Sequence, residues 1–152
     1  MMLSLRGADA RFFDCCEQLL GVRPPTMPNT VAVAHDSAIL WLGPDEWLYH
    51  GHKMVTVTYL RTALTGVHSA VVDVSASRKT VIVVGERAEE VMAKAATLDF
   101  SLTGFPVGTC AQTNIARTQG LIHRRVAQEF VIYVRTSYER YLRAWLADAE
   151  RS

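Results

Sequence analysis

The residues best suited to metal binding or nucleophilic catalysis occur at two places in this sequence. His50 and His52 stand at positions i and i+2, so in a strand both imidazoles point to one face, as two ligands of a zinc ion do. Zinc needs three or four ligands and the cysteine spacing fits no zinc ribbon, so a solvated strand end is the simpler interpretation. Cys110 with His123 is a candidate nucleophile and base, with an inert thiol inside a strand as the simpler alternative.

Two further features are typical of enzymes but carry less weight. Asp45 and Glu46 form an acidic pair in a predicted turn, where neighbouring side chains usually point apart, whereas acid–base pairs need carboxyl groups held together in different environments. Gly85 separates a predicted strand from a predicted helix, but a dinucleotide-binding turn needs three glycines at defined spacing. The sequence therefore predicts no catalytic, cofactor-binding or metal-binding residue on this chain.

The charge distribution argues against nucleic acid and acidic membranes as partners. The 152-residue chain has a formal net charge of +1 and no long run of like charges. A set of arginines in the second half is interpreted as a solvated face, with an anion or partner site as the alternative: Arg78, Arg117, Arg124 and Arg125.

Cysteine usage and the N-terminal residues predict a cytoplasmic protein. The three cysteines include the neighbours Cys15 and Cys16, which rarely pair, so a reducing compartment fits better than a disulfide framework. Residues 1–9 lack the apolar core of a signal peptide, and no continuous apolar stretch is long enough for a membrane span.

The elements that must position these side chains are clearest around residues 71–99. Runs of β-branched residues at 71–74 and 80–84 predict two strands joined by a polar turn. Apolar residues at helical spacing after Gly85 predict a helix over 88–96. A strand–strand–helix unit of this kind cannot bury its own sheet, so the rest of the chain must supply neighbouring strands.

The same order of elements recurs in each half of the chain. In the first half, a strand and a helix capped by Asp9 and ended by Gly21 precede a proline-containing loop, three short strands and a second helix. We interpret the sequence as two copies of a β-α-β-β-β-α unit, residues 1–66 and 67–152, in a single domain of residues 1–152. Helices that cover mostly antiparallel sheets make the predicted fold α+β.

Large aromatic side chains gather in one predicted hairpin. Trp41, Trp47 and Tyr49 lie on either side of a Gly-Pro turn. Core packing explains most aromatic residues of a small domain, whereas exposed ones mark protein interfaces. We predict that this hairpin contacts another protein. If Trp41 and Trp47 are buried instead, their substitution is expected to impair folding.

Three motifs extend this interpretation, because together they resemble one family. They are LWLGPDEWL at 40–48, VVDVSASRKTVIVVG at 71–85 and FPVGTCAQTNIA at 105–116, and the aromatic helix with Tyr138 and Trp145 after FVIYV also fits. In this order, over nearly the whole chain, they resemble the γ subunit of heterotetrameric sarcosine oxidase. The resemblance implies a non-catalytic subunit whose fold is similar to the folate-binding domain of aminomethyltransferases.

The resemblance also implies partners and cofactors. A complex of this kind oxidises the N-methyl group of sarcosine to give glycine, with formaldehyde or methylenetetrahydrofolate as the one-carbon product. The resemblance implies α and β subunits that carry FAD, FMN, NAD and tetrahydrofolate, and a δ subunit that carries zinc. It implies no cofactor on this chain. Related complexes that act on N-methylglutamate have similar γ chains, so the substrate stays open.

Two other functions remain as alternatives. An autonomous folate-binding one-carbon transfer protein would share the fold, but such enzymes enclose folate with three domains and this chain offers two repeats. A metal-binding module would use His50 and His52. Folate binding by the isolated chain would favour the first alternative, and a stoichiometric metal would favour the second.

Overall fold

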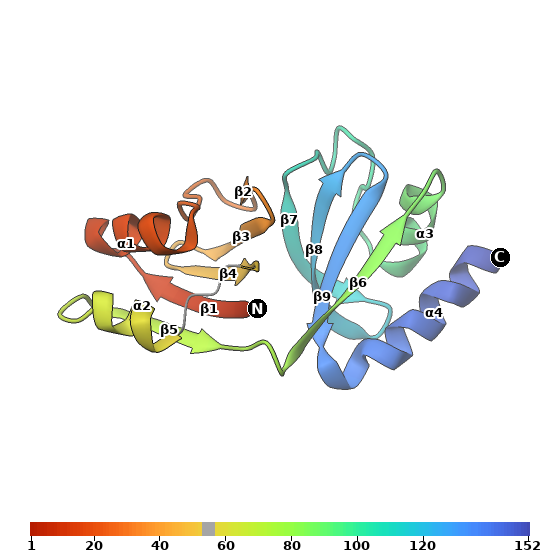
Figure 1. Ribbon diagram of the computed structural model, residues 1–152. Coiled ribbons are helices and arrows are strands. Elements are labelled where there is room, and N and C mark those ends of the chain that lie inside the picture. The colour runs from red at the N-terminus through yellow and green to blue at the C-terminus, as the bar shows by residue number, and fades with distance from the viewer. Residues whose placement is uncertain (53–56) are drawn as a thin grey trace. The chain divides into compact units, whose positions relative to one another are not determined.

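The chain folds into two α+β units, which a computed structural model describes over residues 1–52 and 57–152 (Figure 1). The first unit is Met1–Ser75 and the second is Ala76–Ser152. Each contains an antiparallel sheet and helices that bury an apolar face, as the predicted α+β class requires. Within the described ranges, no helix is both long enough and apolar enough to cross a membrane.

The described residues of the first unit form five strands and two helices. They are β1 (Met2–Gly7), α1 (Ala10–Leu20), β2 (Val31–Ala34), β3 (Ser37–Gly43), β4 (Glu46–His50), α2 (Val57–Ala63) and β5 (Ser69–Asp73). The strands lie in the order β2-β3-β4-β1-β5, and every pair is antiparallel. The first strand of the chain is therefore an interior strand, flanked by β4 and β5.

Local sequence explains where α1 begins and ends. Oδ1 of Asp9 accepts a hydrogen bond from the main-chain N–H of Arg11 at 2.8 Å, and Gly21 ends the helix in the left-handed conformation with φ 80°. Both positions confirm the sequence-based prediction. Gly7 ends β1 so close to Phe12 that a Cβ would lie 2.5 Å from the ring, so glycine is required for α1 to fold back onto its strand.

The second unit repeats the order of elements seen in the first. It consists of β6 (Arg78–Val84), α3 (Ala88–Ala95), β7 (Cys110–Ile115), β8 (Thr118–Val126), β9 (Glu129–Arg135), the short 3-10 helix η1 (Thr136–Tyr138) and α4 (Glu139–Arg151). Its sheet has the order β6-β9-β8-β7 and is antiparallel throughout. From its other edge the order is β7-β8-β9-β6, which matches β2-β3-β4-β1 of the first sheet.

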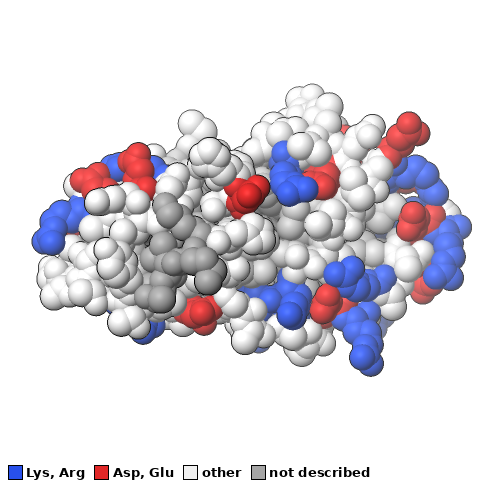
Figure 2. Space-filling model, viewed as in Figure 1, with Lys and Arg blue, Asp and Glu red and all other residues white. Residues whose placement is uncertain are grey.

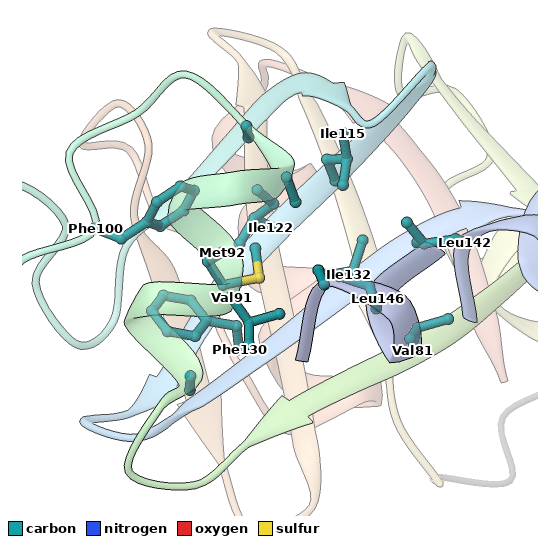
Figure 3. Packing of buried hydrophobic residues seen from close by; sticks show 14 of the residues in the cluster. Val81, Val91, Met92, Phe100, Ile115, Ile122, Phe130, Ile132, Leu142 and Leu146 are labelled. Atoms are coloured by element: carbon teal, nitrogen blue, oxygen red, sulfur yellow. The ribbon is translucent and has the colours of Figure 1, made fainter. Parts of the chain in front are cut away.

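The core of the second unit lies between its sheet and the helices α3 and α4 (Figure 3). Leu142 and Leu146 of α4 point toward the strand residues Val81 and Ile132, and Met92 of α3 is completely buried. Burying a side chain of this size stabilises the fold by roughly 1.5–3 kcal/mol. One face of the sheet is thereby covered by both helices.

The two strands of the region 71–99 belong to different sheets. β5 pairs with β1, with Val71 opposite Leu5, whereas β6 pairs with β9, with Val81 opposite Ile132. The polar turn between β5 and β6 therefore connects the two units and closes no hairpin. The β-branched pattern identifies the strands, but it carries no information about which distant strand each one pairs with.

Candidate functional site

The two histidines lie at and beyond the end of a strand. His50 is the last residue of β4 and is half-buried, and His52 follows the strand and is exposed. In the parts of the chain that the structure describes, no group of three or more His, Cys, Asp or Glu side chains is arranged to hold a metal ion. The geometry thus adds no third ligand to the two that the sequence indicates.

Cys110 and His123, the candidate nucleophile and base, do lie opposite each other. They are cross-strand partners of β7 and β8, which places their Cβ atoms about 4.5–5.5 Å apart. Their exposed fractions are 1% and 2%. A nucleophile must reach its substrate, so the burial of both side chains favours the interpretation as an inert thiol.

The acidic pair and the glycine at the strand–helix junction have structural partners. Arg6 donates a hydrogen bond to Oε2 of Glu46 at 3.0 Å, whereas Asp45 stays in the preceding turn. The main-chain N–H of Gly85 donates to the carbonyl of Gln128 at 2.9 Å and so extends the pairing of β6 with β9. Gly85 has φ 127°, a conformation that favours glycine.

The three aromatic residues of the β3–β4 hairpin differ in burial. Trp47 and Tyr49 are fully buried, because they stand at i and i+2 of β4 and share its inward face. The Trp47 ring stacks on Phe12 at 5.7 Å, and its Nε1 donates to the carbonyl of Pro25 at 2.7 Å. Trp41, the cross-strand partner of Trp47, is half-buried, so it is the member of this set that reaches the surface.

The four arginines of the second half do not form one solvated cluster. Arg78 begins β6, Arg117 lies in the turn between β7 and β8, and the exposed Arg125 forms an ion pair with Glu129. Arg124, in contrast, is buried, with 1% of its surface exposed. On the face shown in Figure 2, basic and acidic side chains are interspersed, in keeping with the small net charge.

Arg124 fastens the long loop between α3 and β7 to the sheet. Its guanidinium donates to the main-chain carbonyls of Phe100 (2.7 Å), Phe105 (3.0 Å) and Ala127 (2.6 and 3.0 Å), pairs with Glu89, and lies 4.8 Å from the centre of the Phe130 ring. Sequence reasoning placed Arg124 on the surface. One feature of the sequence does indicate that Arg124 is buried. It stands two residues after the apolar Ile122, so in a strand both side chains point to the same face, which is the inward face of β8.

The second sheet ends in a free strand edge at β6. β6 is the outermost strand, and the hydrogen bond from Gly85 to Gln128 fixes which of its residues bond to β9. Antiparallel strands bond through alternate residues, so every second residue back from Gly85 faces β9. The residues between them direct their main-chain N–H and C=O groups away from the sheet: Thr80, Ile82 and Val84.

A groove of about 560 Å³ lies between this edge and α4. Its strand side is Val81–Val84, and its helix side consists of residues at i, i+3, i+4 and i+7 of α4: Arg143, Leu146, Ala147 and Glu150. Nη2 of Arg143 donates to the outward carbonyl of Thr80 at 3.2 Å and closes the groove at that end. We call this the β6–α4 groove.

The first unit has a corresponding groove of about 440 Å³ between its outermost strand β5 and α2. Here Arg61 of α2 donates from both Nε and Nη2 to the carbonyl of Val71, at 2.8 and 2.6 Å. Each unit therefore places an arginine of its last helix against the outward carbonyl of an edge strand.

The fold and these surfaces define a class of protein, an α+β chain of two antiparallel-sheet units that each carry a helix beside an outermost strand. The chain belongs to the sarcosine oxidase gamma subunit family, whose model matches residues 6–152. This confirms the family that the motifs at 40–48, 71–85 and 105–116 indicate.

Individual relatives agree with this assignment. Sarcosine oxidase subunit gamma of Arthrobacter sp is 31% identical over 132 residues, covering 86% of this chain and 65% of that protein, and the subunit of Corynebacterium sp. (strain U-96) is 32% identical over 127 residues, covering 83% and 62%. The chain thus spans about two thirds of the length of these curated relatives.

A solved structure is similar over nearly the whole chain. A chain of the heterotetrameric sarcosine oxidase from Corynebacterium sp. U-96 in complex with pyrrole 2-carboxylate matches with a TM-score of 0.89 and 29% sequence identity. The match covers 97% of this chain and 77% of that one. Both units of this chain therefore have counterparts in one polypeptide of that oxidase.

Proposed function

We propose that this chain is a non-catalytic γ subunit of a heterotetrameric flavoenzyme that oxidatively demethylates sarcosine to glycine. The one-carbon product would be formaldehyde, or methylenetetrahydrofolate when folate is present. The observation that carries the proposal is the joint match in sequence and fold: the family model covers residues 6–152, and the TM-score to a chain of a heterotetrameric sarcosine oxidase is 0.89.

The proposal assigns the chemistry to other chains. The partners would be α, β and δ subunits, with FAD, FMN, NAD and tetrahydrofolate on the large subunits and zinc on δ. This chain would contribute surface for assembly. The burial of Cys110 and His123 supports that division of labour, since neither side chain is placed to meet a substrate.

The interface would include the β3–β4 hairpin, with Trp41, Trp47 and Tyr49. Because Trp47 and Tyr49 pack inside the first unit, direct contact with a partner falls to the half-buried Trp41. The two buried rings would fix the hairpin that presents it. Trp41→Ala should therefore weaken assembly, and because Trp41 packs only partly on the core, it should lower the thermal unfolding temperature of the isolated chain less than Trp47→Ala does.

The chain would consist of two divergent copies of one β-α-β-β-β-α repeat, residues 1–66 and 67–152, with a fold similar to the folate-binding domain of aminomethyltransferases. The support is the shared strand order, β2-β3-β4-β1 and β7-β8-β9-β6, with a helix directly after β1 and after β6 and another after β4 and after β9.

The experiment is co-expression of the tagged chain with candidate α, β and δ subunits. We expect the four chains to elute together with flavin absorbance and to oxidise sarcosine. A complex that oxidises N-methylglutamate faster than sarcosine would transfer the assignment to that related class. Sarcosine oxidation by the isolated chain would overturn the non-catalytic role.

Calorimetry on the isolated chain separates the remaining alternative. An autonomous folate protein would bind tetrahydrofolate with micromolar affinity, whereas we expect no measurable heat. Elemental analysis of the same sample tests the metal-binding module through His50 and His52, for which we expect less than stoichiometric zinc.

A further inference from the structure

The later part of β6, from Ile82 on, is a strand edge whose outward main-chain groups are unprotected. The main-chain N–H and C=O groups of Ile82 and Val84 point away from the sheet, and among the described residues they have no hydrogen-bond partner. Thr80, two residues before Ile82, has its outward carbonyl bonded to Arg143. The open part of the edge therefore begins at Ile82 and ends at Val84.

The side chains along this part are apolar and exposed. Ile82 and Val84 have exposed fractions of 49% and 67%, and Val81–Val84 contains no charged residue and no proline. Monomeric proteins usually protect edge strands with charges, prolines, bulges or short length, because a bare edge pairs with other chains. An edge left in this condition is suited to pairing.

The other described edge strands are better protected. β2 has four residues, β7 carries Gln112 and Asn114, and β5 has its outward carbonyl at Val71 bound twice by Arg61. β6 has seven residues, and although it begins with Arg78 and Lys79, its last four, Val81–Val84, carry no polar or charged side chain. It also has a helix at the right place to form a second wall.

That second wall makes the edge a groove of defined shape. Leu146 and Ala147 of α4 face the strand side, and Val91 of α3 also lines the groove. The volume of about 560 Å³ is in the range of ligand sites, about 300–1,000 Å³. The polar groups offered at its strand side are main-chain donors and acceptors at strand spacing, which suit another strand better than a small molecule.

We infer that the β6–α4 groove receives an extended segment of a partner subunit, which adds to the second sheet as a strand beside β6. The inference rests on the proposed function, which supplies the partner subunits. Main-chain hydrogen bonds to Ile82 and Val84 hold the segment, and alternate side chains pack on Leu146 and Ala147.

Charge around the groove specifies the segment further. Arg87 and Arg143 bind carboxylates that do not line the groove, those of Glu90 and Glu139. The unpaired charge on the groove lining is therefore negative and comes from Glu86 and Glu150. Arg87 donates to the main-chain carbonyl of Glu150 at 2.9 Å and so holds the end of α4 near Glu86. The segment accordingly has small apolar residues at alternate positions and a lysine or arginine at its Gly85 end.

The main test removes one donor from the edge. Ile82→Pro deletes an N–H that points away from β9, so the pairing of β6 with β9 is kept, whereas strand addition is blocked. Ile82→Thr is the matched control, because it keeps the N–H and a β-branched side chain. In co-expression with the partner subunits, we expect Ile82→Pro to reduce recovery of the complex about tenfold or more, and Ile82→Thr to stay near wild type.

A second pair of variants tests the helix wall. Ala147→Trp fills the groove, whereas Ala144→Trp places the same ring at an exposed position of α4 that does not line it. We expect Ala147→Trp to reduce complex recovery and Ala144→Trp to leave it unchanged. If Ile82→Pro fails to fold, as judged by circular dichroism, this pair decides the question.

The outcomes distinguish the inference from the function on which it rests. If both Ile82→Pro and Ala147→Trp give the same recovery of the complex as the wild type, the groove does not bind a partner segment, and the γ-subunit proposal stands. Failure of the wild-type chain to assemble would overturn the proposed function itself. A dimer of the isolated chain that Ile82→Pro dissociates would assign the groove to a second copy and overturn a partner segment.

Discussion

Both units hold the long loop after their first helix with one buried side chain from the sheet, but the two side chains differ. In the first unit, the indole of Trp47 donates one hydrogen bond to Pro25. In the second, Arg124 donates to Phe100, Phe105 and Ala127 and pairs with Glu89. One architecture can therefore secure a loop through a neutral donor within an aromatic stack or through a buried cation.

The edges of the two sheets show a second difference. Arg61 makes two hydrogen bonds to the outward carbonyl of β5, whereas Arg143 makes one to β6 and leaves Ile82 and Val84 open. At the first edge, the arginine of its own helix occupies the outward carbonyl in the middle of the strand, that of Val71. At the second edge, the bonded carbonyl lies toward the start of the strand, and the later residues keep their outward groups for the partner segment inferred above.

The largest expected effect comes from removing the buried cation. Arg124→Ala leaves three carbonyls and a carboxylate without their donor and should lower the free energy of unfolding by about 3–5 kcal/mol, measured by urea denaturation. Arg124→Lys should recover little of this, because one ammonium group cannot replace the guanidinium fork.

Arg125→Ala is the matched control for Arg124→Ala. The side chain is exposed and pairs with Glu129, and surface pairs contribute about 0–1 kcal/mol. Equal losses for the two variants would show that burial of Arg124 has no special role, and the contrast between the units would fail.

The neutral donor of the first unit should be less costly to replace. Trp47→Phe keeps the stack on Phe12 but leaves the Pro25 carbonyl without its donor, and we expect a loss of about 1–3 kcal/mol in thermal or urea unfolding. Trp41→Phe, at the half-buried partner position, should cost less than Trp47→Phe. If Trp47→Phe lowered the free energy of unfolding as much as Arg124→Ala, the neutral and the charged side chain would hold their loops equally strongly.

The bonds by which Trp47 and Arg124 hold their loops join residues far apart in the sequence, which is why the sequence did not reveal them. The spacing of apolar residues predicts each helix, and Asp9 and Gly21 mark the ends of α1, because those signals act within a few residues. Arg124 meets carbonyls about twenty residues earlier, and no local pattern reports that the loop returns to it.

The same reasoning applies to the strands and to the candidate site. The β-branched runs locate β5 and β6, yet their assignment to different sheets depends on β1 and β9. The pair of Cys110 and His123 follows from the hairpin of β7 and β8, a local feature, and could be anticipated. The β6–α4 groove needs an edge strand and a helix more than fifty residues apart, so sequence gives no sign of it.

Helix capping provides a smaller contrast between the units. α1 is capped by Asp9, whereas α3 has Arg87 at the cap position and no side-chain capping bond. Asp9→Ala should lower the free energy of unfolding by about 1 kcal/mol, whereas Arg87→Ala should change it by about 0.5 kcal/mol or less. A larger effect of Arg87→Ala would mean that its bonds to Glu90 and to the end of α4 matter more than the cap of α1.

The smallest effect appears at alkaline pH. Burial, with a smaller contribution from Cys15, raises the pKa of the Cys16 thiol from 9.0 to about 12. The unfolded thiol ionises from about pH 9 while the folded one stays neutral. The contribution of Cys16 is therefore complete below pH 9 and is lost between pH 9 and about 12.

At pH 9.5 this loss is on the order of 1 kcal/mol. Urea unfolding of the wild type and of Cys16→Ala at a series of pH values measures it, and the variant should show the shallower decline above pH 9. Parallel profiles would contradict the protonated, buried thiol. Cys15 is the more exposed neighbour and should react first with thiol reagents.

The interior position of β1 has a consequence for synthesis on the ribosome. Met2–Gly7 emerge before both of their neighbours, since β4 ends at His50 and β5 ends at Asp73. β1 must therefore wait for nearly the whole first unit before both of its sides are paired. Until then the nascent chain exposes an apolar strand, which is the interval in which a chaperone can act on it.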